Sequence, residues 1–134
     1  MNRSKPLYSA LVLVFSVILF GCNDSEEKKL SEQEVAIEWA KMSLDITKNT
    51  PSNSPTFASR GFAYLGLTMY ESIVNGYHSN LSMQGQLNDL ERLPKADATA
   101  TYNWVLSLNA GQAAILKNIY MQTSDENKLR VDSL

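Results

Sequence analysis

Cysteine and histidine are almost absent from this sequence of 134 residues, which contains one of each, Cys22 and His78. A single cysteine excludes an internal disulfide framework and any metal site built from several thiolates. The lone histidine excludes catalysis by paired imidazoles, and its place in a polar turn favours a surface position. The sequence also lacks a glycine-rich phosphate loop and any acid or histidine cluster at metal-ligand spacing, so no metal site is predicted.

Basic side chains are too few for a nucleic-acid partner. The sequence contains twelve lysines and arginines and fourteen aspartates and glutamates, so its formal net charge is −2 at pH 7. Nucleic-acid binding requires a basic patch or stripe that neutralises several phosphates. We therefore predict no nucleic-acid partner.

The longest apolar segment lies at the N-terminus. Arg3 and Lys5 precede an uncharged run from Leu7 to Phe20, and a small residue follows at Gly21. This order of a positive, an apolar and a small-residue region is typical of a secretory signal peptide. A helix of this length rises about 21 Å, less than the roughly 30 Å of a bilayer core, which argues against a permanent span.

The segment Leu19-Phe20-Gly21-Cys22 resembles the lipobox that bacterial lipoprotein signal peptidase cuts. We predict a cleavable signal over 1–21, a lipid on Cys22, and a flexible tether over 22–30. The protein would then be held in the cell envelope, on the periplasmic or surface side of the outer membrane, with the membrane as its partner. The alternative is a chance cysteine after an ordinary signal peptide.

The remaining residues, 31–134, are predicted to form one all-α domain. Ser31 and Glu34 have the spacing of a capping box, and a helix is expected over 32–48. Its apolar residues recur at steps of three and four and form one face: Val35, Trp39, Met42 and Ile46.

A second helix is predicted from Pro55 to Asn75, with Ser54 as its N-cap and Gly76 as its end. It carries only two charges, Arg60 and Glu71, and is otherwise apolar or small on nearly every side. Such a helix is expected at the centre of an all-α core.

Arg60 and Glu71 are three helical turns apart on almost the same side of this helix. They would be about 16 Å apart along the axis, so each needs a partner from another element. We interpret both as buried structural charges that fix helix packing. A direct functional role is the alternative.

A long connection over 76–96 follows, and its leucines suggest that it lies against the core. Loops of this length tend to be functional. A third helix is predicted from Asp97, its cap, to Met121, and a short fourth helix begins after Ser124. The predicted fold is thus three long helices and a C-terminal helix stub.

The segment from Ser54 to Val74 is similar to a recurring helix of one large family. It resembles the N-terminal helical region of bacterial vanadium-dependent haloperoxidase-like proteins, in the type-2 phosphatidic acid phosphatase superfamily. Supporting pieces are Trp39 before the proline-containing loop, Trp104, and the run Asn109-Ala110-Gly111-Gln112-Ala113. The resemblance spans residues 35–130 and implies an all-α fold.

The family's oxyanion motifs are missing. They comprise a Lys followed seven positions later by Arg-Pro, then Pro-Ser-Gly-His, then Ser-Arg with a later His, and no lysine here has an arginine at that distance. No catalytic residue is carried over, and vanadate or phosphate is implied only for a full-length relative. We therefore expect a lipid-anchored scaffold that is inactive alone and that lacks a C-terminal catalytic half. The alternative is a membrane-tethered helical module that binds a protein or a ligand.

Overall fold

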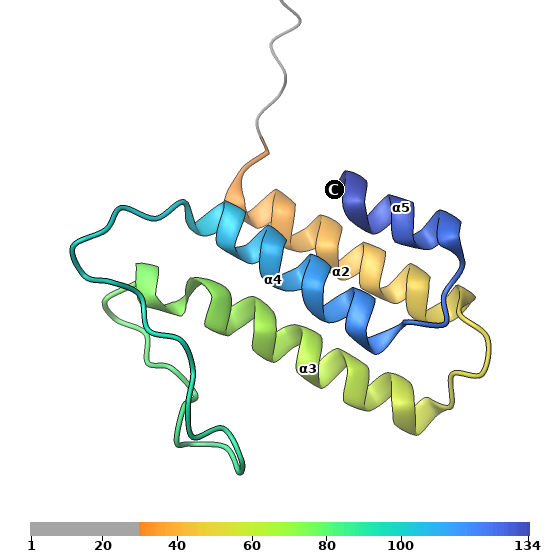
Figure 1. Ribbon diagram of the computed structural model, residues 1–134, viewed down its shortest axis with the longest axis horizontal. Coiled ribbons are helices and arrows are strands. Elements are labelled where there is room, and N and C mark those ends of the chain that lie inside the picture. Colours follow the sequence, from red (N-terminus) through yellow and green to blue (C-terminus); the bar gives the residue numbers. More distant parts are fainter. Residues whose placement is uncertain (1–29) are drawn as a thin grey trace, which may run out of the picture.

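The computed structural model describes residues 30–134, and every regular element within them is helical (Figure 1). The helices are α2 (Glu32–Asn49), α3 (Pro55–Ile73), the single 3₁₀ turn η1 (Val74–Gly76), α4 (Trp104–Ile119) and α5 (Asp125–Ser133). The predicted all-α class is confirmed. The predicted signal peptide, Cys22 and all but the last residue of the predicted tether lie outside the described residues.

The helices lie side by side and alternate in direction along the chain. In Figure 1, α2 and α4 run one way, and α3 and α5 run the other way. The helix α3 packs mainly against α4, and α2 packs against both. Within residues 30–134, no helix is both long enough and apolar enough to cross a membrane.

Three of the helices begin at the serine that the sequence predicts. Ser31 accepts a hydrogen bond from the Glu34 amide, and the Glu34 side chain accepts one from the Ser31 amide, which completes the capping box. The Ser54 hydroxyl accepts from the Phe57 amide at the start of α3. Ser124 does the same for α5. These bonds satisfy amides that the first helical turn leaves without partners.

The predicted start of the third helix at Asp97 is wrong, because α4 begins at Trp104. The Asp97 carboxylate accepts bonds from the backbone and the hydroxyl of Thr99 and closes a local turn instead. Asn103 is the true cap, and its side chain accepts from the Leu106 amide at 3.1 Å. Alanines and threonines alternate between these two caps. Threonine is β-branched and has a low helix propensity, which disfavours a helix that begins at Asp97.

The core is centred on Trp39, which is only 1% exposed. Its indole N–H donates to the Asn109 Oδ1 at 2.7 Å and joins α2 to α4. Other core side chains come from all four α-helices, and they include Ile46, Leu65, Leu116, Tyr120 and Val131.

Glycines let α3 approach α4 closely. A Cβ added at Gly111 would contact Ser72 Oγ and lie 3.3 Å from a methyl group of Thr68, both on α3. The next residue along, Gln112, is fully buried and donates its amide to the Leu65 carbonyl at 3.0 Å. At this crossing α4 therefore contacts both the main chain and the side chains of α3.

A hydroxyl network joins α2 to the far end of α4. Thr47 directs its own proton to the Ser43 carbonyl, so Tyr120 donates to Thr47 Oγ1 across 2.5 Å. The Thr50 and Thr123 hydroxyls lie 2.9 Å apart beside this pair. All of these side chains are buried, and their polar groups are paired as burial requires.

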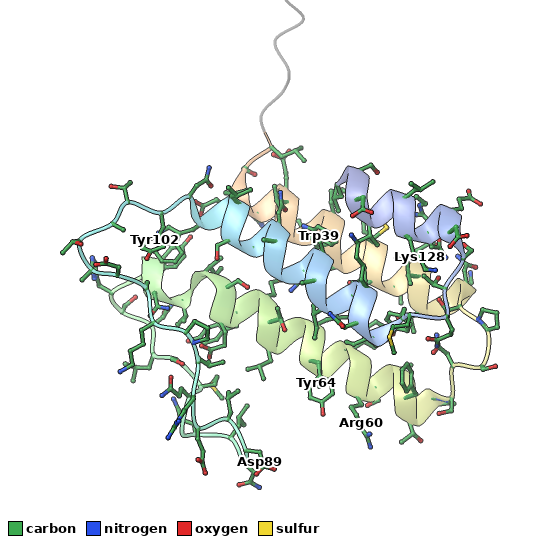
Figure 2. The ribbon with its side chains drawn as sticks, viewed as in Figure 1. Trp39, Arg60, Tyr64, Asp89, Tyr102 and Lys128 are labelled. Carbon is green, nitrogen blue, oxygen red and sulfur yellow. The ribbon has the colours of Figure 1, made fainter. Side chains whose placement is uncertain are left out.

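The predicted central position of α3 is wrong. Only Gly61 and Leu65 are buried along it, and the opposite side is exposed, including Phe62 at 39% and Tyr64 at 51%. In Figure 2, Tyr64 and Arg60 extend from α3 on the side away from α4. The helix is apolar on several faces, but within the described residues only one of them is covered.

Candidate functional site

A cavity of about 660 Å³ lies between α3, α4 and the long loop over 77–103. Its walls combine apolar side chains of the loop with polar groups of α3. The lining includes Glu71, Asn75, Ser82, Gln84, Lys95, Tyr102 and Trp104. This size falls within the range of small-molecule sites, which also combine an apolar lining with a few polar groups.

Glu71 attaches the loop to α3. The Ser82 hydroxyl donates to Glu71 Oε2 at 2.8 Å, and the Met83 amide donates to Oε1 at 2.6 Å. The hydroxyl of Tyr70 adds a bond to the Leu81 carbonyl at 2.7 Å. Glu71 is half-buried, and its partners do come from another element. Bonds to an ionised carboxylate are among the stronger hydrogen bonds in proteins.

The loop is folded around one side chain, Gln84. Its amide N–H donates to the Glu91 carbonyl at 3.0 Å, and its amide oxygen accepts from the Leu93 amide at 3.2 Å. The backbone turns tightly inside this bridge, where Gly85 and Asp89 both have positive φ. Asp89 lies at the loop tip in Figure 2, far from the helices.

Two stacked aromatic rings form the wall where the loop joins α4. The rings of Tyr102 and Trp104 have centroids 5.1 Å apart and planes 28° apart. The Trp104 ring lies against Gly76, where an added Cβ would be 2.7 Å from its Nε1. The Tyr102 hydroxyl accepts from the Asp97 amide at 2.8 Å. The absence of a side chain at Gly76 thus lets the indole close this end of the cavity.

The structure does not bring Arg60 into the cavity. Arg60 is exposed, and the predicted burial of this charge is wrong. It has neither an ion pair nor a hydrogen bond within residues 30–134. His78 is exposed in a turn near the start of the loop. The two charges of α3 therefore have different environments, and only Glu71 contributes to the candidate site.

The described residues do not fit a bound oxyanion such as vanadate or phosphate. Four cations are already paired with carboxylates, in the pairs Lys41–Glu38, Lys117–Asp132, Lys128–Asp125 and Arg130–Asp45. The cavity itself is lined by one cation, Lys95, together with the carboxylate of Glu71. An oxyanion site needs several converging donors. In the same part of the chain, no group of acids, histidines or cysteines is arranged to hold a metal ion.

Two local hydrogen bonds shift the pKa values of surface groups. The Tyr77 hydroxyl donates to Glu32 Oε2 at 2.6 Å, and this bond to a carboxylate raises the pKa of Tyr77. The backbone N–H of Thr99 donates to Asp97, and this bond lowers the pKa of the Asp97 carboxyl group. Both groups are on the surface, so each change in pKa reflects a local hydrogen bond.

Comparison with protein-family models, with curated proteins and with solved structures finds no match.

The sequence did not reveal Ser82 and Gln84 as residues that build the site. Serines and glutamines are common in polar loops, and neither carries a spacing signal of its own. The available signal was the combination of a nearly uncharged helix with one glutamate and a long loop directly after it.

Replacing Glu71 with alanine is expected to release the loop. The Met83 amide and the Ser82 hydroxyl would lose a charged acceptor, a loss of about 1.5–3 kcal/mol per bond. Trypsin cleavage after Arg92 or Lys95 should then become at least about tenfold faster, since 1.4 kcal/mol corresponds to a factor of ten. Glu91→Ala is the matched control, because only the backbone of Glu91 is used by Gln84. Equal cleavage rates in both variants would contradict the proposed attachment.

Proposed function

We propose that this chain is a lipid-anchored helical scaffold that resembles the N-terminal part of vanadium-dependent haloperoxidase and acid phosphatase-like proteins and is not catalytic by itself. The observation that carries the proposal is the exposed apolar side of α3, which includes Phe62 and Tyr64. This side binds a catalytic partner half. Cys22 holds the assembly in the cell envelope, at the outer membrane.

The exposed side of α3 has the chemistry of a helix-packing surface. Its aromatic side chains lie next to the small residues Ala63 and Gly66, which are also exposed. Nothing lies within 4 Å of a Cβ built at Gly66. Small residues between large ones provide the grooves into which the ridges of another helix pack. Exposed apolar patches of this kind mark interaction surfaces.

The residues that support the family resemblance have structural roles, which suits a scaffold. Trp39 and Asn109 bond to each other across the core, Gly111 allows the close helix crossing, and Gln112 is buried against α3. None of them presents a free reactive group to the large cavity. The catalytic groups in this proposal belong to the partner half.

An enzyme assay tests the proposal directly. The purified chain, supplied with vanadate, bromide and hydrogen peroxide, should show no halide oxidation, and it should not hydrolyse a phosphate monoester without vanadate. Measurable turnover in either assay would contradict the assignment as a scaffold. A reading frame that continues past Leu134 into a Pro-Ser-Gly-His segment would support the partner half as part of the same protein.

The second candidate is a self-sufficient, membrane-tethered helical module that binds a ligand or a protein. The observation in its favour is the large cavity, where Glu71, Asn75 and Lys95 accompany an apolar and aromatic lining. A small amphipathic molecule would suit such a lining. Urea unfolding of residues 23–134 separates the two functions. A single cooperative transition favours the module, whereas a state that binds a hydrophobic dye and unfolds gradually favours the scaffold.

A further inference from the structure

A second cavity, of about 280 Å³, lies at the end of the bundle where α2 and α4 begin and α3 ends. Figure 1 shows these three helix ends together, at the end where the chain enters the fold. The cavity is separate from the site under the long loop, although Trp104 contributes to the walls of both.

The lining of this second cavity is almost entirely apolar. Its inner residues come from all three helices and are buried or half-buried: Val35, Ala36, Met69, Ile73, Val105 and Leu108. The carboxylate and amide side chains of Glu32 and Gln33 are exposed at the rim. Because this lining offers a water molecule few polar partners, it favours apolar contents.

The size of the cavity suits a narrow, flexible apolar group. An engineered cavity of about 150 Å³ with a similar aliphatic lining holds one benzene molecule. By that comparison, 280 Å³ accommodates roughly a dozen carbon atoms.

One hydrogen bond lies at the mouth of the cavity. The Tyr77 hydroxyl and Glu32 both line the cavity, and their 2.6 Å bond joins the end of η1 to the first turn of α2. Both residues are exposed. Rotation of the Tyr77 side chain would therefore open the mouth without moving a helix.

The mouth of the cavity is within reach of a lipid on Cys22. The chain from Cys22 to Glu32 covers ten Cα–Cα steps and spans at most about 36 Å when fully extended. An alkyl chain on Cys22, or in a bilayer that holds this end of the protein, lies within that distance of the mouth.

We propose that this cavity binds a single alkyl chain, supplied by the lipid on Cys22 or by a free membrane lipid or fatty acid. The site itself does not depend on the scaffold function proposed above, but the first of these two sources rests on the lipid anchor that forms part of that proposal. The apolar lining takes up the hydrocarbon, the Tyr77–Glu32 bond closes over it, and the polar head of the lipid stays outside.

Photocrosslinking tests the proposal on the full chain. The protein is reconstituted in phosphatidylcholine vesicles that contain palmitic acid with a diazirine midway along the chain. After irradiation, peptide mapping should find the label on cavity residues such as Met69, Ile73 and Val105. An excess of unlabelled palmitic acid should suppress it. Absence of label from these peptides would overturn the proposal.

Two alanines of α2 provide a matched pair of variants. Ala36→Phe fills the cavity and should abolish the label there, whereas Ala40→Phe adds the same ring on the exposed side of α2 and should not. Circular dichroism checks that both are folded. Tyr77→Phe removes the closing bond without adding volume, and the label should reach its plateau sooner. Undiminished cavity labelling in a folded Ala36→Phe variant would overturn the proposal.

A second arm identifies the source of the alkyl chain. The protein is produced in bacteria fed the diazirine fatty acid, so that a lipid on Cys22 carries the probe. A crosslink between the Cys22 peptide and a cavity peptide identifies the anchor as the source. A label that persists in Cys22→Ser identifies a free lipid. Both results support alkyl binding, and a cavity that is unlabelled in both arms contradicts it.

Discussion

Replacing Trp39 with alanine is expected to unfold the protein under conditions in which the original chain is folded. Trp39 is 1% exposed, and truncation of a buried tryptophan costs about 3–5 kcal/mol. Small domains have a total stability of only about 5–15 kcal/mol, so this loss removes much of it. The variant also loses the indole bond to Asn109 that joins α2 to α4.

Urea denaturation of residues 23–134, followed by circular dichroism, measures this effect. Trp39→Phe keeps most of the ring volume but removes the bond to Asn109, and its midpoint should lie between those of the original chain and the alanine variant. Ile37→Ala is the control, because Ile37 is on the same helix but exposed. If the loss for Trp39→Ala were no larger than that for Ile37→Ala, the central role of Trp39 would be wrong.

Gly111→Leu is expected to be the second most damaging substitution, because it separates α3 from α4. A Cβ at this position already meets Ser72 and Thr68, and the further carbons of leucine would extend into α3. Overpacking costs about 1–3 kcal/mol, occasionally more, and here it acts at the main helix contact. The gain of up to about 1 kcal/mol in helix propensity offsets only part of this cost.

Gly66→Leu is the matched control for this prediction. Gly66 is also in the interior of a helix, but a Cβ built there meets nothing within 4 Å. The same change should therefore raise the unfolding midpoint slightly at Gly66 and lower it at Gly111. Similar shifts at both positions would mean that helix propensity, and not the close α3–α4 contact, decides the outcome.

The sequence predicted well those features that depend on a few neighbouring residues. Ser31, Ser54 and Ser124 each cap a helix as expected, because a serine followed by helix-forming residues satisfies local amides whatever the tertiary fold. The face of α2 that carries Val35, Trp39 and Ile46 is buried for a similar reason, since its periodicity is itself local.

Features that depend on competition or on distant partners were not predictable. Asp97 and Asn103 are both good caps, and only the path of the loop decides that Asn103 begins α4. Arg60 and Glu71 share one side of α3, yet the loop reaches only Glu71. The apolar character of α3 indicates burial, but it does not say that only one side is covered within residues 30–134.

The candidate site was predictable in outline only. The length of the connection after Gly76 indicated a functional loop, and Glu71 stood out as a rare charge on an apolar helix. That Ser82 and Met83 meet its carboxylate, and that Tyr102 stacks on Trp104, follows from tertiary geometry. A single sequence carries no record of such pairings.

The side chain of Gln84 gives the long loop an unusual mechanical character. The side-chain amide of Gln84 forms two hydrogen bonds, one with the Glu91 carbonyl and one with the Leu93 amide. These bonds close the loop on itself independently of α3. The loop attaches to α3 through separate bonds, made by Glu71 and Tyr70. If the bonds to α3 break, the tip of the loop over 84–93 stays joined through Gln84, whereas the segments on either side of the tip are released. Opening of the large cavity therefore does not require the tip itself to unfold, which spares the entropy cost of folding the tip again.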